Sequence, residues 1–173
     1  MKILLLGLPG SGKSTQGRLL SEETGWPWIS TGELCRNSND PRIQEIIKSG
    51  QLVDDETITK MFLESISGID NAILDGFPRT DVQAKSLVDA NLVPDAMFEI
   101  VVSYEELIER LKLRGRSDDE EEKVKERVAI YNNMRNNILA VLEENGMKLV
   151  KIDGIGTVEE VFERVKNALK EVE

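Results

Sequence analysis

Five short, mostly apolar runs separated by longer stretches of helical periodicity constrain the fold of this chain most strongly. The runs are Lys2–Leu6, Pro27–Ile29, Asn71–Leu74, Met97–Val102 and Lys148–Ile152. Apolar residues follow one another in these runs instead of alternating with polar ones, which is typical of strands buried on both faces. Strands that alternate with helices predict a parallel sheet covered by helices. The expected fold class is therefore α/β, with a five-stranded parallel sheet flanked by helices.

Two helix starts and one long helix can be predicted between these runs. Ser103 followed by Glu106, and Thr157 followed by Glu160, both match the capping box, in which each side chain binds a free backbone N–H of the other residue. A long pattern over 118–145 places five side chains on one stripe at helical spacing, namely Val124, Val128, Tyr131, Ile138 and Leu142. The stripe is expected to face the core, and Gly146 is expected to end the helix.

Composition excludes several classes of function. The chain has 173 residues, 40% of them hydrophobic, and no apolar run is long enough to cross a bilayer, so one folded domain without a membrane partner is expected. A net charge of −10 argues against nucleic-acid binding. The absence of histidine and the single cysteine exclude Ser-His-Asp triads and thiolate zinc clusters, and they favour a cytoplasmic setting. Any chemistry must therefore use Lys, Arg, carboxylates, hydroxyls or backbone groups.

The segment Gly7–Ser14 follows the first predicted strand and precedes a predicted helix over 14–24. Its sequence, GLPGSGKS, fits the G-x-x-x-x-G-K-[ST] pattern in the strand-loop-helix context that the pattern requires. The loop around Gly10, Ser11 and Gly12 can turn its backbone N–H groups toward phosphate oxygens, and the helix adds its positive N-terminal dipole. We therefore predict a nucleotide-binding loop in which Lys13 supplies a mobile charge. The Ser14 hydroxyl is placed to bind Mg²⁺, and Thr15 is a second candidate.

Asp75, directly after the run Asn71–Leu74, is a candidate second group on the metal side. It would act through water, because Mg²⁺ gives up its hydration reluctantly. Its alternative role is to cap the turn that follows. The chain has no Asn-Lys-x-Asp guanine-reading motif, and the D-x-x-G match at 153–156 lies too near the C-terminus for a GTPase switch. We interpret that match as a turn after the last strand.

The segments Ile29–Arg36 and Asp75–Gln83 resemble the adenylate kinase family of nucleoside monophosphate kinases. With the phosphate loop, Gly50–Val53 and the arginines after Val102, the resemblance covers nearly the whole chain. It implies a P-loop NTPase fold and a single kinase domain over 1–173. The implied parts are a core of 1–29, 57–111 and 118–173, a small helical segment for the nucleoside monophosphate (NMP) at 30–56, and a short lid loop at 112–117.

The resemblance also implies an AMP site. Arg36 and Arg79 would grip the AMP phosphate, Thr31 and Gln83 would face the adenine, and Val53 and Gly76 would help to line the pocket. An arginine fork matches phosphate geometry, and a glutamine offers a donor and an acceptor to a purine. Taken singly, each arginine has an alternative reading as a surface charge, and Gln83 as an exposed helix residue. Cys35 is expected to be a small buried apolar group rather than a nucleophile.

Four arginines within 110–127 form the third group: Arg110, Arg114, Arg116 and Arg127. By resemblance, Arg110 packs against the ATP adenine, while the other three surround the phosphates in transfer. The alternative is a set of surface ion pairs with the acidic run 118–122. Only Gly115 separates Arg114 from Arg116, where long family members insert a separate lid that often carries a zinc site. A short lid without zinc is therefore expected. Gly156 falls on the ATP side, where some relatives place a lysine.

These expectations add up to one reaction, the reversible Mg²⁺-dependent transfer of the γ-phosphoryl group of ATP to AMP, giving two ADP. The residues expected at the transferred group are Lys13, Arg79, Arg114, Arg116 and Arg127. Two alternatives stay open: a UMP/CMP kinase of the same family, or a regulatory protein that binds nucleotides without transferring phosphate. UMP/CMP relatives tend to have Ala at the Thr31 position and Asn at the Thr80 and Gln83 positions, which favours AMP here. ATP and AMP or ADP are the expected partners of a monomer.

Overall fold

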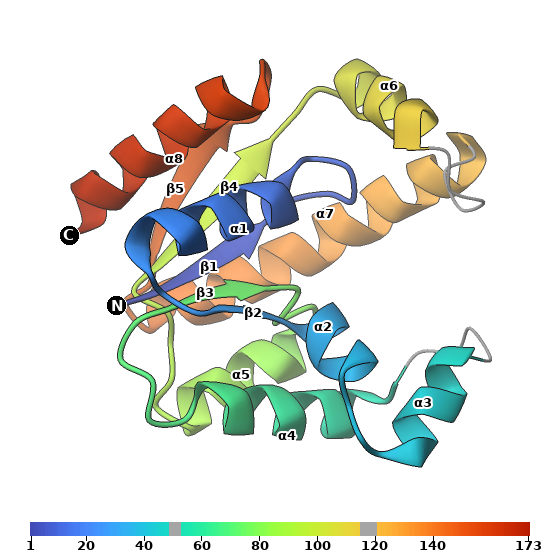
Figure 1. The fold of residues 1–173 in the computed structure, drawn as a ribbon, viewed down its shortest axis with the longest axis vertical. Coiled ribbons are helices and arrows are strands. Elements are labelled where there is room, and N and C mark those ends of the chain that lie inside the picture. Colours follow the sequence, from blue (N-terminus) through green and yellow to red (C-terminus); the bar gives the residue numbers. More distant parts are fainter. Residues whose placement is uncertain (49–52, 115–120) are drawn as a thin grey trace.

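A computed structural model describes residues 1–48, 53–114 and 121–173. Five parallel strands form a sheet of order β2-β3-β1-β4-β5 (Figure 1). Their bounds are β1 Lys2–Leu6, β2 Trp28–Ser30, β3 Ala72–Asp75, β4 Ala96–Val101 and β5 Lys148–Asp153. Every predicted strand is present, and no end differs from its expected position by more than one residue. The α/β class and the parallel sheet are confirmed.

Helices cover both faces of the sheet (Figure 1). Their bounds are α1 Lys13–Thr24, α2 Thr31–Arg36, α3 Pro41–Lys48, α4 Asp55–Ile66, α5 Asp81–Asp89, α6 Tyr104–Arg114, α7 Glu121–Glu144 and α8 Val158–Val172. Side chains of β1 alternate between two cores, because successive residues of a strand point to opposite faces. Ile3 and Leu5 pack with residues of α1 and α8, whereas Leu4 packs with residues of α4, α5 and α7. None of the helices in the described residues is both long and apolar enough to span a bilayer.

The segment after β2 consists of two short helices, α2 and α3, which extend past the end of β2 in Figure 1. Pro41 starts α3, a position where its missing N–H costs no hydrogen bond. The sequence from Asn37 to Pro41 is typical of a break between short helices, and α2 and α3 are separated there. Gly50 predicts a second break in this segment, and it lies outside the described residues.

One of the two capping boxes is complete. Thr157 Oγ1 accepts from Glu160 N, and the Glu160 carboxylate accepts from Thr157 N, as predicted. At α6 only half of the box forms: Ser103 Oγ accepts from Glu106 N at 3.2 Å. The Glu106 carboxylate instead accepts from Arg110 Nε at 2.6 Å, because an arginine one turn further along offers a charged donor.

The predicted apolar stripe on α7 is mostly confirmed. Val124, Ile138 and Leu142 are buried in the core, and Gly146 follows the helix with a φ of 92° that suits glycine. Tyr131 departs from the prediction, because its hydroxyl donates a hydrogen bond to the buried carboxylate of Glu99 at 3.1 Å. The predicted start of this helix at residue 118 lies outside the described residues.

The arrangement of the strands fixes where a ligand can bind. The central strand β1 lies between β3 and β4. The next two strands of the chain, β2 and β3, lie on one side of β1, and the last two, β4 and β5, lie on the other side. In open parallel sheets, such a point creates a crevice beyond the carboxyl ends of the strands. The glycine-rich loop after Leu6 and the polar residue Asp75 after β3 both lie at that edge.

Candidate active site

The loop between β1 and α1 has the backbone geometry of an anion cradle. Gly10 and Gly12 have φ values of 94° and 96°, a left-handed conformation that glycine adopts without strain. Gly12 is the N-cap of α1, and among the described residues no side chain caps this end and no acidic residue lies in its first turn. The backbone N–H groups of the first helical turn and the positive end of the helix dipole therefore meet at the cleft, which suits a phosphate.

The same loop is packed too tightly for larger residues. A Cβ on Gly7 would lie 3.0 Å from the carbonyl oxygen of Ile100 in β4, and a Cβ on Gly10 would lie 2.8 Å from the Leu111 side chain in α6. The loop therefore rests directly on β4 and α6. This support keeps its N–H groups in place before a ligand arrives.

Ser14 and Asp75 come together at the floor of the cleft. Ser14 Oγ donates to Asp75 Oδ2 at 2.6 Å, and Asp75 is only 3% exposed. Asp75 faces Leu5 across the β1–β3 pairing, which brings the carboxylate next to the phosphate loop. A hydroxyl and a carboxylate side by side are hard oxygen donors of the kind that Mg²⁺ prefers. The predicted pairing of these two residues is therefore present in the structure.

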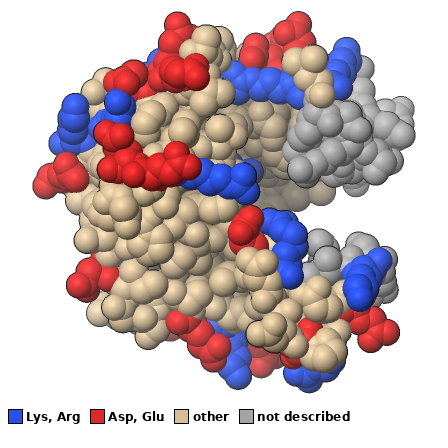
Figure 2. Space-filling model, in the orientation of Figure 1, with Lys and Arg blue, Asp and Glu red and all other residues tan. Residues whose placement is uncertain are grey.

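Basic side chains gather in a cleft of about 570 Å³ beside the loop. Figure 2 shows this face of the molecule hollowed by a notch with basic side chains at its edges. The cations that line the cleft are Lys13, Arg18, Arg36, Arg79 and Arg110. The protein as a whole carries a net charge of −10, so these cations form a local positive site on an acidic body. Such a site attracts an anionic ligand.

Gly76 connects Thr31 and Arg79, two residues of the AMP site expected from the sequence. Its carbonyl oxygen accepts from Thr31 Oγ1 at 3.1 Å and from Arg79 Nε at 2.8 Å. Its φ is 82°, and a Cβ here would lie 2.6 Å from Thr31 Oγ1, so a larger residue does not fit. These bonds hold the Arg79 guanidinium at the wall of the cleft. Val53 lies directly before the N-cap of α4.

Gln83 is buried rather than exposed, which removes its alternative reading. Its side-chain oxygen accepts from Arg79 N at 2.6 Å, and its Nε2 donates to Asp55 Oδ1 at 2.9 Å. The amide therefore connects the start of α4 to the start of α5. Each end of the amide retains one further hydrogen-bonding position, a lone pair on the oxygen and an N–H on the nitrogen, which a nucleobase could use.

Arg36 shares an acidic partner with an arginine that sequence reasoning missed. Glu33 Oε1 accepts from Arg36 and from Arg18, each at 3.4 Å. Arg18 also lies over the Trp28 ring, with its Cζ 4.7 Å from the ring centroid. A sequence signal existed, because Arg18 is four residues after Ser14 on α1 and therefore shares its helix face.

The thiol of Cys35 lies near these arginines but is buried, as predicted. Burial raises the pKa of the Cys35 thiol, and the charges of Arg79 and Arg36 only partly oppose that effect. The thiol is therefore in its protonated and weakly nucleophilic form at neutral pH. Cys35 acts as a packing residue.

Arg110 lies on the other side of the phosphate loop. Its Nη1 donates to the carbonyl oxygen of Ser11 at 3.2 Å, and its Nη2 donates to that of Gly154 at 2.7 Å. It therefore bridges the loop and the turn after β5. A pocket of about 340 Å³ lies there, lined by Arg110, Gly156, Thr15 and the loop residues Gly10–Gly12. Six of the nine residues expected on the ATP side thus line one pocket, and Lys13 and Ser14 line the neighbouring cleft.

The remaining arginines are placed only in part. Arg114 is the last residue of α6, and residue 127 lies within the first two turns of α7. Arg116 lies outside the described residues, as does half of the predicted lid 112–117, namely residues 115–117. The roles expected for these three arginines therefore remain predictions.

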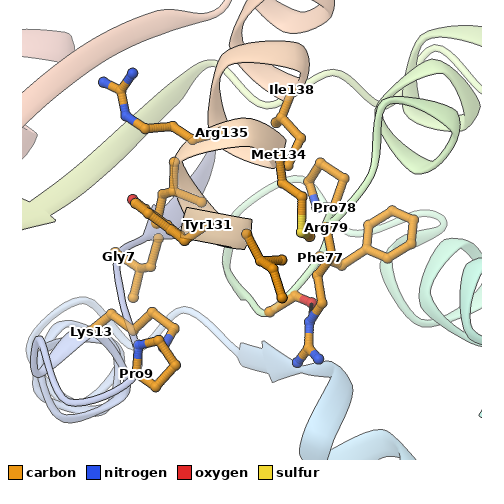
Figure 3. Close-up of a pocket in the computed structure, with 14 residues that line it drawn as sticks. Gly7, Pro9, Lys13, Phe77, Pro78, Arg79, Tyr131, Met134, Arg135 and Ile138 are labelled. Carbon is orange, nitrogen blue, oxygen red and sulfur yellow. Dashed lines mark hydrogen bonds between the residues drawn. The ribbon is translucent and has the colours of Figure 1, made fainter. Parts of the chain in front are cut away.

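An apolar cavity of about 280 Å³ lies between α7, the phosphate loop and the turn after β3. Figure 3 shows Tyr131, Met134 and Ile138 of α7 on one side of it, with Lys13 and Arg79 facing it from two other elements. Next to the cavity, both oxygens of Glu99 are bound by the guanidinium of Arg135, with Arg135 Nη2 2.6 Å from Glu99 Oε2. Sequence reasoning missed this pair.

The charged state of Glu99 is secured by its partners. Burial raises the pKa of the Glu99 carboxyl, but the hydrogen bonds from Arg135 and Tyr131 and the Arg135 charge outweigh burial, and its pKa lies below the ordinary value. Burial and the neighbouring Glu99 raise the pKa of Tyr131 well above its ordinary value. At neutral pH, Glu99 is therefore an anion and Tyr131 a hydrogen-bond donor.

A phosphate loop after the central strand of a parallel sheet, with arginines on both sides of one cleft, defines a P-loop nucleotide-binding protein with room for more than one phosphate group. Known proteins narrow this class. A sequence model of the adenylate kinase family matches residues 5–147. An adenylate kinase of Mycobacteroides abscessus is 40% identical over 182 aligned residues, which cover 98% of this chain and 99% of that protein.

Two further adenylate kinases show the same extent of similarity. That of Mycolicibacterium paratuberculosis is 39% identical and that of Corynebacterium aurimucosum 37%, each over 98% of this chain and 99% of that protein. The chain belongs to the adenylate kinase family. The expected P-loop NTPase fold and the class of nucleoside monophosphate kinase, a phosphotransferase, are thereby confirmed.

Proposed function

We propose that this enzyme transfers the γ-phosphoryl group of ATP to AMP, reversibly, giving two ADP. The observation that carries the proposal is the single cleft in which the phosphate loop and Lys13 face Arg36 and Arg79. An oxygen of the AMP phosphate attacks the γ-phosphorus of ATP, and the bond from that phosphorus to the β–γ bridging oxygen breaks. One ADP is the leaving group and the other is the phosphorylated acceptor.

The donor nucleotide binds on the side of the loop where Arg110 lies. Its phosphates contact the loop backbone and the first turn of α1, and its base lies near Arg110 and Gly156. The proposed ATP-binding residues are Gly10, Ser11, Gly12, Lys13, Ser14, Thr15, Arg110, Arg114 and Gly156. The pocket of about 340 Å³ between the loop and Gly156 supports this assignment.

The acceptor nucleotide binds on the opposite side, against α2 and the turn after β3. The proposed AMP-binding residues are Thr31, Arg36, Val53, Gly76, Arg79, Gln83, Arg116 and Arg127. The hydrogen bonds that join Thr31, Gly76 and Arg79 support a pocket prepared before binding. The backbone N–H of Arg79 donates a hydrogen bond to the Gln83 side chain. The residue proposed to recognise the base and the residue proposed to bind the phosphate therefore hold each other in place.

Transfer requires alignment and charge neutralisation rather than a general base, because the attacking oxygen belongs to an anionic phosphate. Lys13, Arg79, Arg114, Arg116 and Arg127 are proposed to stabilise negative charge on the oxygens of the moving group. Cations fixed in a cleft that excludes water act more strongly than they would in bulk solvent. We further propose that residues 30–56 and the lid 112–117 close over the nucleotides, which prevents hydrolysis of ATP.

Mg²⁺ fits the residues at the floor of the cleft. The buried carboxylate of Asp75 and the Ser14 hydroxyl are adjacent oxygen donors, and both line the same cleft as the phosphate loop. We propose that they hold the ion together with the ATP phosphates, directly or through water. When bound, the ion would neutralise charge on the β- and γ-phosphate oxygens.

The proposed compartment and partners of the enzyme follow from its substrates and its composition. We propose that the enzyme acts as a cytoplasmic monomer on ATP and AMP or ADP, without zinc, nucleic acid or membrane partners. The chain has a single cysteine, which can form no internal disulfide, and its net charge is −10. These properties suit a reducing compartment and small anionic ligands.

An acceptor-specificity assay tests the proposed function. With MgATP as donor, AMP is expected to give the highest kcat/KM, about 10²-fold above CMP, UMP and GMP, because a site that hydrogen-bonds one base discriminates strongly against others. The measurement is a coupled assay of ADP formation with each monophosphate in turn. Preference for CMP or UMP would identify the enzyme as a pyrimidine monophosphate kinase. Binding of ATP and AMP without formation of ADP would instead establish the non-catalytic regulator.

A further inference from the structure

Glu99 and Arg135 form a charged pair between the sheet and the longest helix of the described residues. Glu99 lies on β4 and is only 4% exposed, and Arg135 of α7 binds both of its carboxylate oxygens. Tyr131, one turn earlier on α7, donates to the same carboxylate. Three polar groups thus meet between α7 and β4, where the other packing residues are largely apolar.

The energetics of this pair indicate a role other than stability. Removing two charges from water costs free energy, so apolar residues of similar volume at such a place are often equally or more stabilising. A guanidinium fork on a carboxylate, however, has one preferred geometry, whereas apolar contacts such as those of Ile138 and Leu142 are not directional. The pair therefore fixes the rotation and the translation of α7 on the sheet.

The position of α7 matters because this helix forms a wall next to the reacting groups. Ile130, Tyr131 and Met134 line the same cavity as Lys13 and Arg79 (Figure 3). Arg135 also lines this cavity, but in Figure 3 its guanidinium extends away from Lys13 and Arg79. Arg127 is carried by the same helix, eight residues before Arg135.

Glu99 also lies next to the residues of β4 that support the phosphate loop. Glu99 faces Leu6 across the β1–β4 pairing, and Leu6 directly precedes Gly7. The carbonyl of Ile100, the next residue of β4, is the group that a Cβ on Gly7 would approach to 3.0 Å. The same short stretch of β4 thus supports the loop that carries Lys13 and anchors α7.

We infer that Arg135 and Glu99 are positioning residues for phosphoryl transfer, because their ion pair sets the distance of the α7 wall from Lys13 and Arg79. The inference rests on the proposed function. Displacement of reacting groups by about 1 Å can lower a rate by 10²-fold. Loss of the pair should therefore lower kcat, while the KM values for ATP and AMP, which depend on each nucleotide separately, stay within about twofold.

The central test is the double variant Glu99→Leu/Arg135→Met, which removes both charges and leaves neither one unpaired. We expect its melting temperature to fall by only a few degrees, because the Tyr131 hydroxyl loses its acceptor while no charge is left unpaired. We expect its kcat to fall by 10- to 100-fold and its affinity for diadenosine pentaphosphate to fall by at least tenfold. The linked ligand needs both nucleotide sites in register, so its affinity, measured by calorimetry, reports alignment without turnover. Wild-type kcat and wild-type pentaphosphate affinity in this variant would overturn the inference.

Two further variants keep the test decisive if the double variant does not fold. Arg135→Lys retains the charge but loses the fork, so it should also lower kcat and pentaphosphate affinity with unchanged KM values; wild-type values would contradict the inference. The matched control Glu163→Leu/Lys166→Met removes an ion pair of 2.6 Å on the distant helix α8 and should leave all values unchanged. Equal losses in this control would show a nonspecific effect and overturn the inference.

The experiments distinguish a failure of the proposed reaction from a failure of the positioning role. If the wild type formed no ADP from ATP and AMP, the proposed reaction would be wrong, yet the pentaphosphate affinities of wild type and variants would still decide whether the pair aligns the two sites. Weaker binding of the linked ligand, with unchanged binding of ATP alone, would support the positioning role. Equal weakening of both ligands would contradict it.

Discussion

Lys13→Met is expected to lower kcat by about 10³-fold or more, the range seen when one donor to a developing phosphate charge is removed. Methionine keeps most of the length and apolar volume of lysine but carries no charge. The Lys13 side chain lines the cleft beside the phosphate loop, and the proposed role of its ammonium group is to follow the moving phosphoryl group. The measurement is the initial rate of ADP formation at saturating MgATP and AMP.

The fold of the Lys13→Met variant should remain intact, because Lys13 begins α1 at the edge of the cleft and is not part of the core. Circular dichroism and thermal unfolding check this point. Lys85→Met is a suitable control, since Lys85 is an exposed residue of α5 that pairs with Asp81 and lies outside the cleft. A Lys13→Met enzyme with wild-type activity would refute the role assigned to this lysine.

Arg79→Ala is expected to have the second large effect, a loss of about 10³-fold in kcat/KM for AMP, comparable to the loss of an arginine finger. The Arg79 Nε is bound to the carbonyl of Gly76, which orients the guanidinium at the cleft wall. In its proposed role Arg79 binds the acceptor phosphate and places a charge at the transferred group, so its removal would take away both. Both kcat and the KM for AMP should therefore change, whereas the KM for ATP should not.

Arg79→Lys separates charge from geometry. Lysine preserves the positive charge but cannot make two parallel hydrogen bonds to a phosphate, so activity should lie between that of wild type and of Arg79→Ala. If Arg79→Ala instead raised only the KM for ATP, Arg79 would belong to the donor side, and the proposed arrangement of the two nucleotides would be wrong.

The strands could be predicted because their signal is local. Three to six mostly apolar residues between polar helical segments were enough to identify each buried parallel strand, to within one residue at its ends. The order of the strands was not predicted, since it depends on which helix packs on which face. The start of α8 was predicted in full because the Thr157–Glu160 box is a four-residue pattern.

The phosphate loop and the Ser14–Asp75 pair were predictable for a related reason. The loop is a contiguous motif, and Asp75 ends a strand whose carboxyl end had to lie at the same edge as the loop. Gln83 shows the limit of such reasoning. Its residue type suggested base recognition, but its bonds to Arg79 N and Asp55 depend on how α4 packs against α5.

The Glu99–Arg135 pair could not be predicted from local pattern. Glu99 interrupts an apolar run, and Arg135 lies 36 residues later on a helix with other polar residues. Only the tertiary packing of α7 on β4 joins them. A buried charge in the middle of a strand does, however, require a partner of opposite charge, so Glu99 alone could have indicated that such a partner exists.

The central claim is that two nucleotides lie end to end in one cleft, with cationic side chains where their phosphates meet. The most direct measurement is a crystal structure of the enzyme with diadenosine pentaphosphate. The account predicts both adenosine halves ordered, one beside Arg110 and Gly156 and the other beside Thr31 and Gln83, with Lys13 and Arg79 on the phosphate chain and residues 30–56 displaced toward it. One ordered half only, or Arg79 directed into solvent with residues 30–56 unmoved, would contradict it.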